Sequence, residues 1–547
     1  MRYGEPARGR AGRGRPSPSR GRAARSRGRQ PAKGHHGWLS RAWHAFRAKT
    51  ALAQLGYSFV AVSGVLIVTV GAVGVGWYEH LVGSISSFSA GGLTGRTIYG
   101  DLNILVLGSQ ERQGQVGFFG NEQNPWTTNS DNLLLVHLDA THTHATVLSI
   151  PRDLMTYEPA CEARIPQIGI GMQGPYDYPP GSIIDGALNI GGPTCAVETV
   201  EALTGVKLDH VIELDFNSFR TMVDAVGGVP VCVPKGGYHD PKSHISLGPG
   251  IHLVKWDEAL AYVRTRDTLQ GADAGGDLPR IQLQQAFISS LVQKVQSQGL
   301  LNNFSELLRL ATTAAKAVAV DKGLASVTDL IGLAKSLVHL HSRDLNLLTL
   351  PTTTDTFDNP TYNQRLMTVQ PQDDVLFQML RTGQAWHGAL PVEPRNKVRV
   401  IVENATGQTG LAKRTAATLT KLGFDVIHYG DAPYTTGTVV QYKGMINADS
   451  AYTLMRALKQ FPAGEDMLES PASRVGVPAP VTLILGTNFA GVTPAKAPVK
   501  PTKPAKSAKK GKHKTSPPVI AASSNTGPGE VGYRNGAANI CQGLPLG

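Results

Sequence analysis

One uncharged stretch constrains the chain more than any other feature. Residues 51–78 are apolar or small, apart from Gln54 near the start, and Arg41, Arg47 and Lys49 precede them. As a helix, this stretch could cross the roughly 30 Å hydrocarbon core of a bilayer. Because basic flanks stay on the cytoplasmic side, the pattern favours an uncleaved, single-pass transmembrane helix over a buried core helix. We therefore expect a cytoplasmic N-terminus and extracellular domains after the helix.

The positive charge of the chain, +12 overall, is concentrated at its two ends. Residues 1–50 hold fourteen Lys and Arg against one acid, and residues 492–547 begin with a lysine- and proline-rich, low-complexity run. Segments of this composition cannot bury enough apolar surface to fold, so we predict a disordered basic segment and a low-complexity tail. The part between them is mildly acidic, which gives no reason to expect a nucleic-acid partner.

The chain has four cysteines, Cys161, Cys195, Cys232 and Cys541. An extracellular location permits disulfides. Cys161 and Cys195 lie in one loop-rich region, so we favour a disulfide between them, while a bond between Cys232 and Cys541 stays open. No cysteine spacing indicates a zinc site.

Strand-like and helix-like segments alternate between residues 98 and 385. Apolar runs such as 103–107 and 145–150 predict strands, whereas residues 193–203, closed by Gly205, and the helical periodicity over 278–295 predict helices. This alternation favours an α/β fold, with a three-layer α/β/α main domain over residues 98–385.

A proline-bearing joint separates the main domain from a second, smaller one. Residues 388–394 form the joint, and the following segments, over residues 397–488, have the order β-α-β-β-α-β. We therefore predict a smaller α/β domain there.

Charged residues in the main domain stand at the ends of its apolar segments. The strand over 147–150 is stopped by Pro151, and Arg152 follows at once. Loops at strand ends of α/β sheets collect functional groups. An arginine offers a planar fork to phosphate oxygens, and a carboxylate suits a magnesium ion that also binds phosphate. The candidates for such a polyanion site are Asp131, Arg152, Arg264, Arg266, Asp277, Arg280 and Gln284.

Several segments together resemble the LytR-CpsA-Psr family of cell-wall enzymes, over roughly residues 98–300. The resemblance is carried by residues 103–109, 130–131, 149–153, 203–205, 223–229 and 262–266. Residues 397–488 resemble the C-terminal domain often appended to that family, with residues 400–404 and 410–412 as its marks.

The resemblance implies a function at the outer face of the membrane. The family takes anionic glycopolymers, such as teichoic acids or wall polysaccharides, from a polyprenyl-pyrophosphate carrier and attaches them to peptidoglycan. The resemblance therefore implies a phosphotransferase with a Mg²⁺ cofactor bound by Asp131. It also implies a deep apolar pocket for the polyprenyl chain. Catalytic roles would fall to Asp131, Arg152 and Asp277. The pyrophosphate-binding residues would be Arg112, Arg152, Arg264, Arg266, Arg280 and Gln284, with Asp277 and Gln284 ordering the arginines.

Three positions depart from the family pattern. A magnesium-binding aspartate is here Gln110, a neutral and weaker ligand; a lysine near the donor phosphates is Ile183; and an arginine is Leu283. These changes motivate an alternative, a non-catalytic member that binds lipid-linked glycans or wall polymer. A membrane-bound transcription regulator is a third reading, resting on the basic N-terminus alone. Asp153 or another carboxylate would act as general base.

Overall fold

The computed structural model describes ten parts of the chain. They are residues 85–96, 98–109, 129–162, 172–173, 182–266, 278–297, 304–354, 365–467, 476–493 and 531–544. The predicted transmembrane stretch, 51–78, lies outside them, as do Gln110, Arg112 and Asp277. Of the helices within these ten parts, none is long and apolar enough to cross a membrane.

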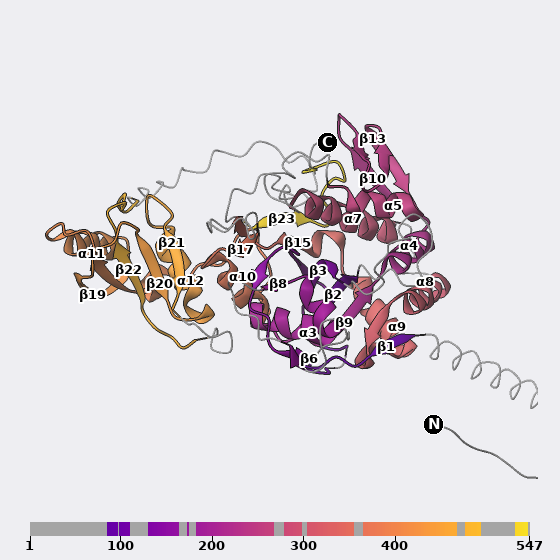
Figure 1. Ribbon diagram of the computed structural model, residues 1–547, viewed down its shortest axis with the longest axis horizontal. Coiled ribbons are helices and arrows are strands. Elements are labelled where there is room, and N and C mark those ends of the chain that lie inside the picture. The colour runs from indigo at the N-terminus through magenta and orange to yellow at the C-terminus, as the bar shows by residue number, and fades with distance from the viewer. Residues whose placement is uncertain are drawn as a thin grey trace, which may run out of the picture. The chain divides into compact units, whose positions relative to one another are not determined.

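A mixed eight-stranded sheet is the centre of the main domain (Figure 1). Its inner strands β2, β3 and β4 are antiparallel neighbours, and β9 and β15 join them in parallel on either side. The strands, in spatial order, are β1 (Ser86–Phe88), β14 (Ala319–Asp321), β9 (His210–Leu214), β2 (Leu102–Ser109), β3 (Ser130–Leu138), β4 (Ala145–Ile150), β15 (Leu345–Thr349) and β23 (Gly532–Asn535).

Alternating side chains give this sheet two apolar faces. On β2, Leu105 and Leu107 share a buried cluster with residues of helix α3, whereas Val106 packs with a second cluster that includes Ile288 of α7. Successive strand residues point to opposite faces, so helices cover both sides of the sheet. The helices are α3 (Gly186–Thr204), α4 (Phe216–Ala225), α5 (Trp256–Arg264), α7 (Leu278–Ser297), α8 (Phe304–Ala317), α9 (Val327–Ser336) and α10 (Gln372–Arg381).

Helix α3 is kinked, and the kink accommodates a disulfide. Gly192 has a φ of 68°, and Pro193, which lacks an N–H, follows it. A Cβ at Gly191 would lie 2.8 Å from Cβ of Cys195 and 3.0 Å from Cβ of Cys161. Those two cysteines form the disulfide that we favoured from the sequence. The helix ends at Gly205, a left-handed cap residue.

Short strand pairs complete the main domain. They are β5 (Met155–Thr156) with β8 (Ser182–Ile183), β6 (Cys161–Glu162) with β7 (Met172–Gln173), β10 (Val229–Val233) with β13 (Gly250–Val254), β11 (Tyr238–Asp240) with β12 (Ile245–Leu247), and β16 (Thr352–Thr354) with β17 (Leu366–Thr368).

The second domain, in its described residues, is a five-stranded sheet with two helices. Its strand order is β19-β18-β22-β20-β21. The predicted β-α-β-β-α-β order is present, with the additional short strand β21 before the last one. The elements are β18 (Arg399–Asn404), α11 (Leu411–Lys421), β19 (Asp425–Asp431), β20 (Val439–Tyr442), α12 (Ala448–Met455), β21 (Ala463–Asp466) and β22 (Val481–Leu485).

The C-terminal end corrects one prediction. We assigned residues 492–547 to a single low-complexity tail, but residues 531–544 return to the main sheet. Strand β23 pairs antiparallel with β15, and Cys541 is bonded to Cys232. The error arose because the composition of the lysine-rich run was extended to the whole segment, although its last residues include Tyr533, Arg534 and Cys541.

Candidate functional site

The register of two strands brings the first pair of site residues together. Strands β3 and β4 are antiparallel, with Leu133 opposite Ile150. The ladder ends at this pair, and Asp131 and Arg152 each lie two residues beyond it, which places them near each other. The Arg152 Nη1 atom donates to Asp131 Oδ1 over 2.7 Å. Both side chains are less than one-fifth exposed, so this ion pair is well shielded from water.

Further charged groups surround this pair. Asp153 Oδ2 lies 3.6 Å from Arg152 Nε, and its Oδ1 accepts a 3.2 Å hydrogen bond from Arg365. Asp185 precedes helix α3 but does not cap it with its side chain. Its carboxylate instead accepts a 3.4 Å hydrogen bond from the Asn129 side chain. The result is a cluster of acids and arginines at the ends of β3 and β4.

Burial changes the protonation of Asp185. Desolvation raises the pKa of its carboxyl to about 6, and the negative charges of Asp153 and Asp131 add to the rise, while Arg152 and Arg365 oppose it. Asp185 therefore titrates closer to neutral pH than an ordinary aspartate.

One face of helix α7 lines the site, with polar side chains near its start and apolar ones further along. Arg280 and Gln284 lie in its first two turns, and Phe287, Ile288 and Leu291 follow on the same face at helical spacing. Arg280 Nη2 donates to the backbone oxygen of Asp131 over 3.4 Å. One face of this helix thus changes from polar to apolar along its length.

Helix α5 delivers a second arginine. Arg264 is its last residue, and the guanidinium carbon lies 4.6 Å from the ring centre of Phe216, a cation–π distance. Gln284 donates a 3.1 Å hydrogen bond to the carbonyl of Val263 and so ties α7 to the end of α5. The backbone N–H of Arg266 bonds to Asp240 over 2.9 Å.

A cavity of about 220 Å³ lies between α4, α5, α7 and the sheet. One part of its lining is charged or polar and includes Asp131, Arg264, Arg280 and Gln284. The remainder is mostly apolar, with Val106, Leu134, Leu214, Phe216, Phe219, Met222, Val223, Leu260, Val263, Phe287, Ile288 and Leu291. A cavity with a polar head region and an apolar body suits an amphiphilic ligand.

The structure gathers most of the residues that we selected from the sequence. Asp131, Arg264, Arg280 and Gln284 line the cavity, and Arg152 joins them through Asp131. Arg266 is not among the lining residues. Gln110, Arg112 and Asp277 lie outside the described residues. Ile183 lies in β8, opposite Met155.

Two members of the cluster, Asp185 and Arg365, were missed. Asp185 stands at a helix start, where an aspartate normally indicates a cap, so its sequence context suggested nothing further. Arg365 follows a long connection after β16 and belongs to none of the motifs that we used. Only the spatial arrangement identifies these two.

The donor set fits a magnesium ion that shares its coordination with phosphate. Magnesium is commonly held by one or two carboxylates plus phosphate oxygens and water, and Asp131 supplies a carboxylate at the polar end of the cavity. Among the described residues, one group of three potential metal ligands lies close together: Glu158, Cys161 and Cys195. Its two sulfurs form a disulfide, so we do not assign a metal there.

Sequence comparison decides the family. The profile of the LytR_cpsA_psr family matches residues 90–374, more than half of the chain. The chain belongs to this family. A second profile, described as the LytR cell envelope-related transcriptional attenuator, matches residues 397–489. The resemblance seen in the sequence motifs is thereby confirmed.

Several relatives in the LytR-CpsA-Psr family have descriptive names. The cell wall biosynthesis protein LcpA of Corynebacterium glutamicum is 28% identical over 415 residues, which cover 69% of this chain and 76% of LcpA. TagT of Bacillus subtilis, a polyisoprenyl-teichoic acid–peptidoglycan teichoic acid transferase, is 29% identical over 38% of this chain and 56% of its own length. A crystal structure of B. subtilis TagV covers 52% of this chain and 96% of its own, with 22% identity and a TM-score of 0.39.

Proposed function

We propose that this family member is a membrane-anchored phosphotransferase that moves an anionic glycopolymer from a polyprenyl-pyrophosphate carrier to peptidoglycan. The face of α7 carries the proposal. Arg280 and Gln284 suit a pyrophosphate, and Phe287, Ile288 and Leu291 continue as an apolar wall suited to a prenyl chain. The name of TagT, which specifies transfer of teichoic acid to peptidoglycan, supports the same reaction class.

The proposed reaction is a phosphoryl transfer assisted by the charged groups around the pyrophosphate. An acceptor hydroxyl of peptidoglycan attacks the phosphorus that bears the glycopolymer. The bond from this phosphorus to the bridging oxygen breaks, and polyprenyl phosphate leaves with the bonding electrons. Arg152, Arg264 and Arg280 stabilise the charge that develops on the phosphates. When bound at Asp131, magnesium would neutralise part of the pyrophosphate charge.

The proton of the acceptor hydroxyl needs a base. A general base works best when its pKa lies near the working pH, and the pKa of Asp185 is raised to about 6. Asp153 is already paired with Arg365 and Arg152, which occupies its carboxylate oxygens. We therefore assign the proton to Asp185 in preference to Asp153.

A substitution inside the cavity tests whether the cavity binds the prenyl chain of the carrier. Met222 lines the cavity, and a Met222→Trp substitution should fill part of the space that a prenyl chain needs. We expect binding of farnesyl pyrophosphate to weaken at least about tenfold, since several buried methylene contacts are lost. Binding of inorganic pyrophosphate should stay within about twofold, because its site is at the other end. Isothermal titration with both probes measures the difference.

The matched control for this substitution is Met222→Leu. It keeps the side chain apolar and close to its original volume, so both affinities should be retained. If Met222→Trp left farnesyl pyrophosphate binding unchanged, the cavity would not be the carrier site. If the native chain bound neither probe, the proposed function itself would be wrong.

The location of the chain is part of the proposal. Residues 51–78 would anchor it, with residues 1–50 in the cytoplasm and the two domains outside. In intact, wall-stripped cells, a tag placed after Gly547 should be accessible to protease, and a tag before Arg2 should be protected. The opposite pattern would overturn the anchor and its orientation.

A further inference from the structure

The C-terminal segment, residues 531–544, lies beyond both family matches and yet belongs to the main sheet. The second profile ends at residue 489. Strand β23 extends the sheet at β15, with Leu347 opposite Arg534 and Thr349 opposite Gly532 (Figure 1). The sheet therefore has an edge strand that is separated from its neighbour by the whole second domain in sequence.

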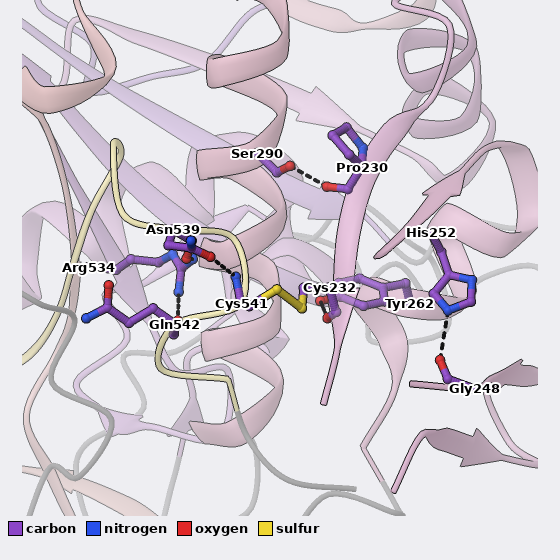
Figure 2. Close-up of a disulfide and its surroundings, with 10 residues drawn as sticks. All are labelled: Pro230, Cys232, Gly248, His252, Tyr262, Ser290, Arg534, Asn539, Cys541 and Gln542. Carbon is purple, nitrogen blue, oxygen red and sulfur yellow. Dashed lines mark hydrogen bonds between the residues drawn. A yellow bond between two sulfur atoms is a disulfide. The ribbon is translucent and has the colours of Figure 1, made fainter. Parts of the chain in front are cut away.

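A buried arginine shapes this C-terminal segment. Arg534 is only 3% exposed. Its Nη1 donates to the carbonyl of Gln542 over 2.6 Å, and its Nη2 donates to that of Asn539 over 3.1 Å (Figure 2). A buried charge is costly unless hydrogen bonds compensate it. The loop after β23 supplies these bonds by wrapping around the guanidinium group.

The same segment is fastened to the back of helix α7. Arg534 Nε donates to Ser289 Oγ over 3.3 Å, and Gln293 Nε2 donates to the carbonyls of Gly536 and Ala538 over 2.7 and 3.0 Å. These contacts lie one to four turns after Arg280 and Gln284, which face the cavity on the same helix. Because a helix is stiff over this length, contacts that fix its C-terminal half also constrain its N-terminal half.

A disulfide connects the segment to strand β10, which contacts the second arginine-bearing helix, α5. Cys541 is bonded to Cys232 of β10, and the carbonyl of Cys232 accepts a 3.4 Å hydrogen bond from the Tyr262 hydroxyl (Figure 2). Tyr262 lies in α5, two residues before Arg264. Its ring centre is 6.4 Å from that of Phe287 in α7. The disulfide is therefore linked to α5 through Cys232 and Tyr262, and Tyr262 in turn contacts Phe287 of α7.

We propose that residues 531–544 are a positioning element for the pyrophosphate site. Arg534 and the Cys232–Cys541 disulfide hold α7 and α5 in the arrangement that directs Arg280 and Arg264 into the cavity. Within the described part of the chain, Arg534 donates to Ser289, Asn539 and Gln542, none of which lines the cavity. It therefore acts through Ser289 and the loop that presents Cys541. The effect on ligand binding rests on the proposed function, whereas the effect on α7 does not.

Reduction of the full-length chain in detergent is the first test. Dithiothreitol passes two electrons and two protons to the sulfurs of Cys232 and Cys541, which become thiols, while the reagent closes to its cyclic disulfide. We expect affinity for farnesyl pyrophosphate to fall about tenfold, which is the effect of misplacing one charge-assisted hydrogen bond. Affinity for farnesol should change less than about twofold, because the apolar body of the cavity is retained.

The Cys232→Ser/Cys541→Ser double variant is the matched control. It should bind farnesyl pyrophosphate as weakly as the reduced native chain and show no further loss with dithiothreitol. Native-like affinity in the variant, followed by a loss with dithiothreitol, would assign the effect to the Cys161–Cys195 disulfide instead and overturn the proposal. Equal losses for farnesol and farnesyl pyrophosphate would also overturn it, since they would indicate general loss of structure.

Arg534 has its own pair of variants. Arg534→Gln should reproduce the selective loss of farnesyl pyrophosphate affinity, and Arg534→Lys should restore part of it, because an ammonium group can still donate to the carbonyls of Asn539 and Gln542. Affinity within about twofold of the native value in Arg534→Gln would exclude a positioning role for this arginine.

Amide hydrogen exchange separates this proposal from the proposed function. On reduction, exchange should accelerate about tenfold in residues 280–286 at the front of α7, while β2 and β3 remain protected. This result would support the positioning role even if the native chain failed to bind farnesyl pyrophosphate. In that case only the proposed function would be wrong. Unchanged exchange in α7 after complete reduction would overturn the positioning role.

Discussion

Replacing Arg152 with alanine should weaken farnesyl pyrophosphate binding by about a hundredfold. The partly buried guanidinium pairs with Asp131 over 2.7 Å, and we assign it to the pyrophosphate, where loss of a charge-assisted hydrogen bond costs roughly 1.5–3 kcal/mol. Alanine would also leave Asp131, Asp153 and Asp185 to repel the incoming phosphates. Titration of the native and variant chains with farnesyl pyrophosphate and with farnesol measures the effect.

Arg152→Lys is the informative companion variant. It retains the charge but not the planar fork, so we expect partial recovery of the affinity. Binding of farnesol should be the same in all three proteins, because the apolar part of the cavity is unaltered. If both variants bound farnesyl pyrophosphate like the native chain, Arg152 would have a structural role only.

The same alanine substitution should change the pH dependence of stability. Arg152 lowers the pKa of Asp185, which is about 6 in its presence, so alanine should raise this pKa further. A carboxyl with a raised pKa binds more protons in the folded state, and its penalty on stability is relieved as the pH falls through that pKa. As the pH falls from 8 to 6, the free energy of unfolding should therefore rise more steeply in the Arg152→Ala variant than in the native chain. An additional Asp185→Asn substitution should remove this difference.

Asp131→Asn should abolish magnesium-dependent transfer of a lipid-linked glycopolymer. The substitution removes the carboxylate that we assign to the metal and leaves Arg152 and Arg280 without their shared negative partner. Metal-free affinity for inorganic pyrophosphate should be retained or increased, because a negative charge next to the phosphates is lost. A transfer assay with and without magnesium, together with titration calorimetry, distinguishes the two effects.

Gln110 decides between catalysis and binding alone. Gln110→Asp places a carboxylate where the resemblance implies a magnesium-binding aspartate and should tighten magnesium binding, although tighter ground-state binding need not raise turnover. If only the Gln110→Asp variant transferred glycopolymer, the native chain would be a binding member of the family. If Asp131→Asn retained full transfer, the assignment of the metal to Asp131 would be wrong.

Much of the local structure could be predicted from the sequence. The apolar run over 103–107 is part of β2, and the run with helical periodicity over 278–295 falls within α7. Gly205 ends α3 in a left-handed conformation, as its position after an apolar helix predicts. These features depend on side-chain periodicity and backbone freedom over a few residues, which are properties of the local sequence.

The candidate site was predicted as a set of residues but not as an arrangement. Motifs selected Asp131, Arg152, Arg264 and Arg280, yet their convergence depends on the β3–β4 register and on how α5 and α7 pack. Arg365 lies in no motif, and Asp185, two residues after Ile183, was passed over because an aspartate at a helix start predicts a cap. Their role follows from neighbours that are distant in sequence.

By itself, the sequence determined the alternation of strands and helices, the family and the main charged residues, because periodicity and motifs are local. The tertiary structure decided which of those charges meet, which acid is desolvated, and that residues 531–544 complete the main sheet. The pairing of β23 with β15 and of Cys541 with Cys232 joins segments hundreds of residues apart. Such contacts depend on the closure of the whole fold, which no short stretch of sequence encodes.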